Sequence, residues 1–206
     1  MIDEHSFGYD VIEEEDGFTL SVQSVPWRGL ADELAELHYL RGAQFIRQLK
    51  LITDYGDFHL VDGETDIYSL ANPKDEDYLF LLDAARKAAS LGYSVYILPN
   101  PKNIRTADFI LVQRNIYKMY DLKTIHGKSS VINRLMESIG QTRHVILNMA
   151  VDYSTRKLTS DLKKYFEVSQ QAVEVLIFKG RKVIIVNRRL TQSPRFYAEF
   201  KKMYEK

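Results

Sequence analysis

The sequence contains no cysteine among its 206 residues, so neither a disulfide framework nor a thiolate metal site can form. It has no run of about 18 consecutive apolar residues, the length that a membrane-spanning helix needs. Its five histidines are scattered without ligand-like spacing, which argues against a structural zinc site. The first residues lack the basic and apolar regions of a signal peptide, which predicts a cytoplasmic protein unless the chain is excised from a longer secreted one.

The chain also lacks a net charge at neutral pH, because 28 Lys and Arg residues balance 28 Asp and Glu residues. The balance hides an asymmetry along the chain. Residues 1–80 hold 5 basic and 18 acidic residues, a net charge of −13, whereas residues 81–206 hold 23 basic and 10 acidic residues, a net charge of +13. Such a pattern indicates either a polyanion-binding part joined to an acidic part, or two solvated surfaces that balance for solubility.

The composition is that of a folded protein with a real core, since 45% of the residues are apolar and 12% are aromatic. Pro73 and the charged run at 74–77 mark the best candidate boundary. They divide the chain into an acidic hairpin-plus-helix region, residues 1–74, and an α/β domain, residues 75–206. We expect an α+β fold in which helices pack on a small central sheet, mostly antiparallel, with an additional N-terminal α/β element.

Hydrophobic periodicity and turn residues predict the elements of both parts. In the first region we expect a hairpin at 9–22, a helix over 30–52, and short strands at 58–61 and 67–70. In the second region the expected elements are a helix over 75–90, a strand at 93–98, a hairpin of strands at 107–112 and 116–123, a helix from 129 or 130 to 140, a strand at 144–149, a helix around 160–169, a hairpin at 173–178 and 181–186, and a helix that opens at Ser193-Pro194.

Asp121 and Lys123 form the first candidate functional pair. They lie two residues apart on a predicted strand, and strand alternation places both on one face of the sheet. One interpretation is a salt bridge with no further role. The other is that both groups surround a phosphate, with Lys123 neutralising charge on its oxygens and Asp121 handling a proton or a metal ion.

The loop that follows, residues 124–130, leads into a predicted helix N-terminus, where free backbone N–H groups favour an anion. Gly127 lets the backbone approach a ligand closely, and His126 suits proton transfer near neutral pH. The loop lacks the full glycine pattern of a nucleotide-binding P-loop, so an ATPase is rejected. The candidates for contacts with phosphate or RNA are Lys128, Ser129, Ser130, Arg134, Gln141 and Arg188, although Arg134 and Gln141 equally suit a solvated helix face.

Aromatic residues interleave with these charges at Tyr117, Tyr120, Tyr165 and Phe166. Bases could stack on such rings, as they do in proteins that bind single strands. The alternative is that the rings belong to the core. The pattern alone leaves both interpretations open.

Several segments between about residues 77 and 189 together resemble one protein family. They are the Ala-rich helix and strand at 85–96, Leu98-Pro99, residues 106–110, residues 120–124, Gln141 with residues 144–147, and the hairpin at 175–188. The chain here resembles the C-terminal tRNase domain of contact-dependent growth inhibition toxins, within a wider group of barnase-like, colicin-type and RelE-like bacterial nucleases. It departs from the family at Ala107-Asp108, where Pro-Asp is usual, and at Asp121-Leu122-Lys123, where Glu-x-Lys is usual.

The resemblance implies a metal-independent ribonuclease without a cofactor. Its partners would be RNA, in the first place tRNA, and a protein inhibitor, with no membrane involved. In such enzymes the 2′-OH of the RNA attacks the adjacent phosphate and leaves a 2′,3′-cyclic phosphate. Asp121, Lys123, His126 and Thr124 are then the catalytic candidates.

A second resemblance uses the same residues differently. Asp108, followed by Asp121-x-Lys123 on consecutive strands before a helix and a strand, is similar to the pattern of PD-(D/E)xK metal-dependent nucleases. It implies that Asp108 and Asp121 hold Mg²⁺ while Lys123 positions the attacking water. A third interpretation is a non-catalytic binding or accessory protein that kept the fold and lost the activity.

Overall fold

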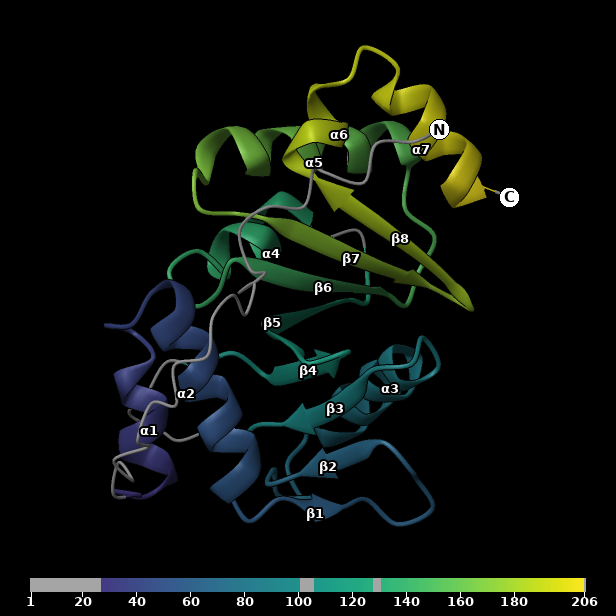
Figure 1. Ribbon diagram of the computed structural model, residues 1–206. Helices are drawn as coiled ribbons and strands as arrows, with labels where there is room; N and C mark the ends of the chain where they lie inside the picture. Colours follow the sequence, from purple (N-terminus) through teal and green to yellow (C-terminus); the bar gives the residue numbers. More distant parts are fainter. Residues whose placement is uncertain (1–26, 101–105, 128–130, 206) are drawn as a thin grey trace.

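The computed structural model describes residues 27–100, 106–127 and 131–205, and within them the chain forms seven helices and eight strands (Figure 1). The helices are α1 (Leu30–Glu36), α2 (Gly42–Tyr55), α3 (Tyr78–Ala89), α4 (Val131–Glu137), α5 (Thr155–Val168), α6 (Arg188–Gln192) and α7 (Phe196–Glu205). The strands are β1 (His59–Leu60), β2 (Ile67–Ser69), β3 (Ser94–Ile97), β4 (Phe109–Gln113), β5 (Ile116–Ile125), β6 (His144–Met149), β7 (Glu174–Lys179) and β8 (Lys182–Asn187). The hairpin predicted at 9–22 lies outside the described residues.

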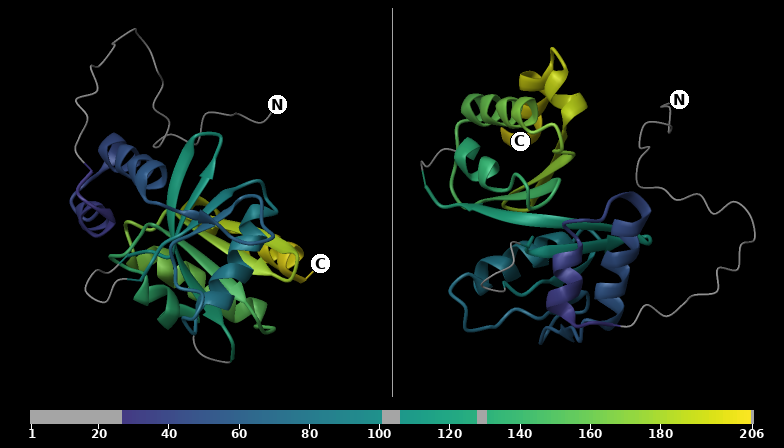
Figure 2. Two further views of the ribbon diagram at one scale, coloured as in Figure 1. Left: turned by 90° about the horizontal axis from the view of Figure 1, so that it is seen from below. Right: turned by 90° about the vertical axis from the view of Figure 1, so that its left-hand side faces the viewer.

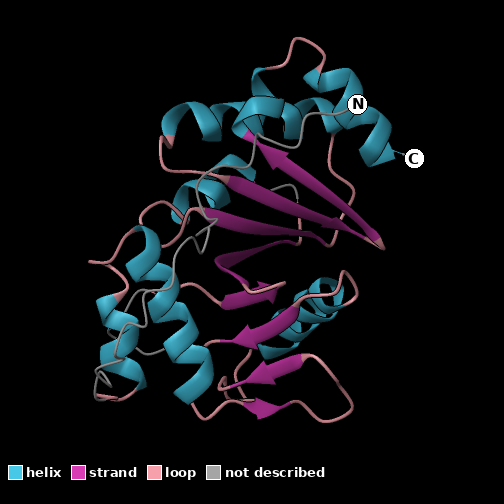
Figure 3. Ribbon diagram, in the orientation of Figure 1, coloured by secondary structure: helices cyan, strands magenta, loops and turns pink. Residues whose placement is uncertain are grey.

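All eight strands, magenta in Figure 3, form one sheet, and their order in the sheet is their order along the chain (Figure 1). Four neighbouring pairs are antiparallel, namely β1–β2, β3–β4, β4–β5 and β7–β8, and the other three are parallel. The predicted α+β fold is confirmed, but the prediction of a small sheet is wrong. The short strands β1 and β2 extend the sheet, because β2 pairs with β3 across the predicted boundary at residue 74.

Helices cover both faces of this sheet. On one face, here termed the α3 face, Leu82 and Ala85 of α3 pack against Phe109 and Tyr120. On the other, termed the two-group face, α1 and α2 pack over β4 and β5, while α4 to α7 pack over β5 to β8. The right-hand view of Figure 2 shows them as two separate groups. The purple-blue helices α1 and α2 lie below the long strand β5, and the green-to-yellow helices α4 to α7 lie above it.

The central hairpin β4–β5 forms where the sequence predicts it. Its turn places Arg114 and Asn115 in left-handed backbone conformations, with φ of 50° and 63°, as tight hairpin turns require. The two strands therefore pair right up to the two-residue turn, with Gln113 opposite Ile116. Strand β5 continues past the predicted end at residue 123, because its pairing with β6 extends to Ile125 opposite Met149.

The helix predicted over residues 30–52 is instead two helices. The chain turns between Leu37 and Gly42, and Gly42 has a φ of 55°, a conformation that favours glycine. The turn lets α1 and α2 pack against each other around the buried carboxylate of Glu33, which pairs with the Arg28 guanidinium at 3.2 Å and accepts a hydrogen bond from Gln48. Helix α5 likewise begins earlier than predicted, because the Ser154 hydroxyl caps it.

In the part of the chain that the structure describes, no helix combines the length and the apolar character needed to cross a membrane.

Candidate functional site

Asp121 and Lys123 lie side by side on the two-group face of β5, which confirms that alternation brings them together. Lys123 Nζ is 2.7 Å from Asp121 Oδ2, and the two side chains are only 13% and 3% exposed. The apolar side chains of Ile125, Val145 and Leu147 occupy the same face beside them. In such surroundings, charge interactions are stronger than at the protein surface.

Asp108 lies next to this pair because it continues the ladder at the start of β4. Its backbone N–H donates to the Tyr120 carbonyl at 3.0 Å, and its own carbonyl accepts from the Leu98 N–H at 2.8 Å. Its side-chain Oδ2 accepts a hydrogen bond of 2.6 Å from the Leu122 backbone N–H. The loop residue that precedes β4 is thereby fixed beside Asp121.

The two carboxylates disturb each other's ionisation. Burial, followed by the negative charge of Asp121, raises the pKa of Asp108 to about 7, although the Leu122 N–H and the Lys123 ammonium act in the opposite direction. When both carboxyls are ionised, one ammonium faces two negative charges. The site thus favours additional positive charge when both carboxylates are ionised.

These donors suit a hard divalent cation. Mg²⁺ is commonly bound through one or two carboxylates and completes its octahedron with waters and substrate phosphate oxygens. Asp108 and Asp121 supply two carboxylates from adjacent strands. Over the described ranges, no group of three or more His, Asp or Glu side chains gathers into a fuller cage. Two carboxylates alone would leave most of the octahedron of Mg²⁺ to waters and substrate oxygens.

Helix α5 and the turn that follows α4 bring two buried hydroxyls together near Asp121. The Tyr165 hydroxyl of α5 lies 3.3 Å from the Ser138 hydroxyl, which donates to the Leu135 carbonyl at 2.6 Å. Tyr165 and Ser138 are fully buried, and burial, together with the charge of Asp121, raises the pKa of Tyr165. Because the two residues are 27 positions apart, no local sequence signal predicts this contact.

Thr124 and His126 do not join the carboxylates. Thr124 follows Lys123 on β5, so its side chain points to the α3 face. His126, just past the end of β5, packs edge-on against Phe80 of α3, with ring centroids 4.6 Å apart. The four catalytic candidates are thus divided between two faces of the sheet. Lys128, Ser129 and Ser130 lie outside the described residues.

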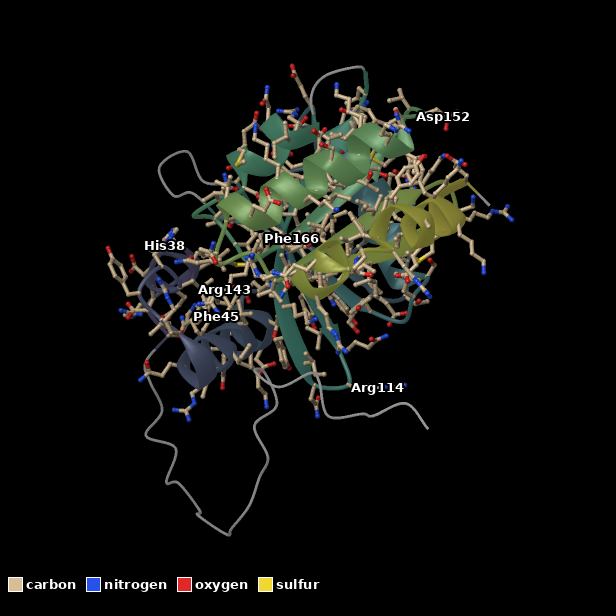
Figure 4. All side chains as sticks on the ribbon, turned by 90° about the horizontal axis from the view of Figure 1, so that it is seen from above. His38, Phe45, Arg114, Arg143, Asp152 and Phe166 are labelled. Carbon is tan, nitrogen blue, oxygen red and sulfur yellow. The ribbon has the colours of Figure 1, made fainter. Side chains whose placement is uncertain are left out.

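The remaining candidates for contacts with phosphate are engaged elsewhere. Arg134 pairs with Glu137 at 3.0 Å on the exposed side of α4, and the Gln141 amide donates to the Glu137 carbonyl at 3.2 Å. Arg188 donates to the carbonyls of Phe166 and Ser169 at the end of α5, where Figure 4 labels Phe166 among the C-terminal helices. Arg188 therefore satisfies the free carbonyls of a helix C-terminus.

Most of the aromatic residues considered for stacking are core residues. Tyr120, Tyr165 and Phe166 are buried, and the Tyr120 hydroxyl donates to Glu174 at 2.5 Å. Tyr117 is half-buried and packs against the cluster under α1 and α2. The core interpretation holds for the three buried rings.

A second polar cluster lies on the α3 face. Lys87 Nζ is 2.7 Å from Asp83 Oδ2 and 2.8 Å from Asn148 Oδ1, while the Asn148 amide donates to Asp83 at 3.0 Å. Burial acts to raise the pKa of Asp83, but hydrogen bonds from Lys87 and Asn148 outweigh it and lower that pKa. The three side chains satisfy one another and tie α3 to β6.

No protein-family model matches the chain, and no curated protein sequence does. Among solved structures, it is similar to a chain in a CdiA-CT/CdiI toxin and immunity complex from Burkholderia pseudomallei. The match is 13% identical, covers 58% of this chain and 98% of that chain, and has a TM-score of 0.38. At this TM-score nothing about fold or activity follows, so the family predicted from the sequence stays a prediction.

Proposed function

We propose that the protein is a nuclease that hydrolyses phosphodiester bonds with the help of a divalent cation, in the manner of PD-(D/E)xK nucleases. The observation that carries the proposal is the buried trio of Asp108, Asp121 and Lys123 on adjacent strands, with two carboxylates facing one ammonium. A plain salt bridge accounts for Asp121 and Lys123, but it does not account for a second buried carboxylate, Asp108, held beside them.

The chain's own residues would divide the work as follows. Asp108 and Asp121 would hold the cation, which supplies Lewis-acid activation of the scissile phosphate and of a water. Asp108 is held in place by the Leu122 N–H, so its carboxylate is oriented before substrate arrives. Lys123, paired with Asp121, would orient the attacking water and offset negative charge on the phosphate oxygens.

The metal-independent ribonuclease is the weaker candidate. Its chemistry needs an acid, a base and a cation around a single phosphate. His126 and Thr124 lie toward the α3 face, whereas Asp121 and Lys123 lie on the opposite face, so these four side chains do not converge. RNA, and tRNA in particular, remains the first substrate to test, because the sequence resemblance points to it, and a protein inhibitor remains a proposed partner.

The deciding experiment incubates the full chain with total tRNA in Mg²⁺, with and without EDTA, beside Lys123→Ala. We expect cleavage in Mg²⁺, its loss in EDTA, and its loss in the variant. The chemistry of the ends separates the alternatives, because hydrolysis leaves no cyclic phosphate.

Cleavage that survives EDTA and leaves a 2′,3′-cyclic phosphate would instead identify the metal-independent ribonuclease. Absence of cleavage from tRNA, other RNA and DNA, with a folded protein, would favour a binding protein on a nuclease-like scaffold.

A further inference from the structure

One side of helix α5 carries positive charge over most of its length. Among residues 155–164, the exposed ones are Ser160 and four basic residues. These four, here termed the basic stripe, are Arg156, Lys157, Lys163 and Lys164. At about 100° per residue they fall within about 120° of the helix circumference, so they share one side. The opposite side of α5 belongs to the core, and Figure 4 looks onto this helix, drawn in green.

The charges of the basic stripe are not offset by acidic neighbours. On α3, α4 and α7, a basic residue pairs with an acidic residue of the same helix, as Lys201 does with Glu205 at 3.7 Å. Within the described ranges, no side chain of the basic stripe forms an ion pair. Asp161, which lies between them in the sequence, is buried and accepts a hydrogen bond from a tyrosine hydroxyl. Lys157 and Lys163 lie over aromatic rings, which leaves their charge in place.

Part of the basic stripe lies where it destabilises the helix. Helix α5 begins at Thr155, so Arg156 and Lys157 lie in its first turn, and no acidic residue accompanies them there. The N-terminal end of a helix carries a partial positive charge, which disfavours cations in the first turn. Folding therefore does not explain these two residues, whereas a negatively charged ligand would offset their charge.

A hollow adjoins the C-terminal end of the basic stripe. It has a volume of about 280 Å³ and is lined by residues of α5 and α6, namely Lys163, Phe166, Glu167, Arg188, Thr191 and Gln192. Arg188 and Thr191 already donate to backbone carbonyls, which leaves Lys163 and Gln192 as donors for a ligand. A polyanion that follows the stripe would therefore meet further hydrogen-bond donors at the hollow.

We propose that the basic stripe and the adjoining hollow bind the sugar–phosphate backbone of a nucleic acid. Arg156 and Lys164 are eight residues apart, about 12 Å along the helix axis, so a small anion would engage only part of the stripe, whereas a chain of phosphates matches all of it. Contacts of this kind position a nucleic acid without reading its sequence. The inference adds a binding surface outside the reacting groups, and it rests on the proposed nuclease function only for the choice of tRNA as the probe.

The test measures binding of fluorescently labelled tRNA to the full chain by anisotropy, in EDTA so that metal-dependent cleavage cannot occur, over a series of KCl concentrations. The stripe variant replaces its four basic residues with glutamine, as Arg156→Gln, Lys157→Gln, Lys163→Gln and Lys164→Gln. The matched control removes the same charge from exposed residues elsewhere, as Arg47→Gln, Lys50→Gln, Lys74→Gln and Arg114→Gln.

We expect the stripe variant to bind tRNA at least about tenfold more weakly at about 100 mM KCl. The slope of log K against log[KCl] should become shallower by about two or more, because each phosphate contact that is lost leaves its counterions on the tRNA. The control is expected to stay within about threefold of wild type with a slope changed by less than about one. Equal losses in both variants, or no binding by the wild type, would overturn the inference.

A competing occupant lies within the chain itself, because residues 1–26 hold seven Asp and Glu residues and no Lys or Arg. The melting temperature separates the two. We expect it to be unchanged or higher in the stripe variant, because cations leave the first turn of α5. Unchanged tRNA binding together with a lower melting temperature would overturn the inference in favour of an acidic segment of the chain.

Two smaller variants guard against loss of folding. Lys163→Gln with Lys164→Gln should weaken tRNA binding by at least about threefold, whereas Lys163→Arg with Lys164→Arg keeps the charge and should bind as wild type does. An equal loss in both pairs would contradict a role of charge. Because the measurement needs no cleavage, a protein that binds tRNA through the stripe but cuts nothing would refute the nuclease and keep this inference.

Discussion

The two faces of the sheet each carry a lysine paired with an aspartate at 2.7 Å, yet the two clusters differ in electrostatic balance. On the α3 face, Lys87 and Asn148 together satisfy Asp83, and they lower its pKa. On the two-group face, Lys123 must serve Asp121 with a second carboxylate, Asp108, beside it, and the pKa of Asp108 rises to about 7. The first cluster is complete as it stands, and the second favours a cation. The difference separates a structural ion pair from a candidate reactive site.

The largest expected effect is on cleavage. Lys123→Ala should reduce the rate by at least about 100-fold, because a group that orients water and offsets charge at the reacting phosphate contributes factors of this size. Lys87→Ala removes an equally short ion pair from the other face and is the matched control. It should stay within about threefold of wild type in a gel assay of tRNA cleavage. Equal losses in both variants would contradict the distinction between the clusters.

The second effect concerns stability against pH. The pKa of Asp108 is about 7 in the fold, compared with about 3.9 in an unfolded chain. The folded state therefore binds more protons across that window, and stability falls as the pH rises through it. Asp108→Asn should remove this loss and raise the free energy of unfolding at pH 8 by about 1 kcal/mol or more, measured by urea denaturation.

Asp83→Asn should change the free energy of unfolding in the opposite direction. The lowered pKa of Asp83 contributes stability that is present above the unfolded pKa and is lost as the pH falls through the folded one. This variant should therefore be less stable than wild type at pH 8 and should approach it in acid. A gain for Asp83→Asn, or no gain for Asp108→Asn, would reverse the comparison.

The third effect is binding of a cation without substrate. At about ten times its dissociation constant, Mg²⁺ should raise the melting temperature of the wild type by about 3–5 °C. Asp108→Asn should abolish most of this shift, whereas Asp83→Asn should keep it. Differential scanning fluorimetry with NaCl at matched ionic strength controls for screening. An equal shift in all three proteins would show that the ion acts elsewhere.

The smallest effect belongs to the exposed face of α4. Arg134 and Glu137 form an ion pair in which both side chains are nearly half exposed. Such pairs contribute less than about 1 kcal/mol. Arg134→Ala should change stability and cleavage by little, within about twofold for the rate. A loss comparable to that of Lys123→Ala would extend the site to α4 and restore Arg134 as a phosphate contact.

The central hairpin and its polar pair were predictable because their signals are local. Alternation along residues 116–123 and the turn at Arg114 and Asn115 fix which side chains share a face. Thr124 was expected in the loop after residue 123, and because β5 instead extends to Ile125, alternation places its side chain on the face opposite Lys123.

Other features depend on contacts between distant segments. Arg188 binds carbonyls of Phe166 and Ser169, about twenty positions earlier in the chain, and no sequence period reports such a contact. The break before Gly42 depends on a backbone conformation that glycine permits but does not demand. Strands β1 and β2 join the sheet because β2 pairs in parallel with β3, with Ile67 opposite Val95. Helix α3 connects these two strands, so neither strand alone indicates the pairing.

The strand order has a consequence for how the molecule is made. Because each strand pairs with the one just before it in the chain, the sheet can grow in step with synthesis, without waiting for a distant partner. The hairpin that unites Asp108 with Asp121 is complete once residue 125 has emerged. At about 5–20 residues per second, the ribosome needs a further 4–16 s to finish residues 126–206. Helix α5 ends at Val168, 43 residues after residue 125, so the acidic pair precedes α4 and α5 by about 2–9 s of that time, and a cation already present during translation would meet an open site and a half-built protein.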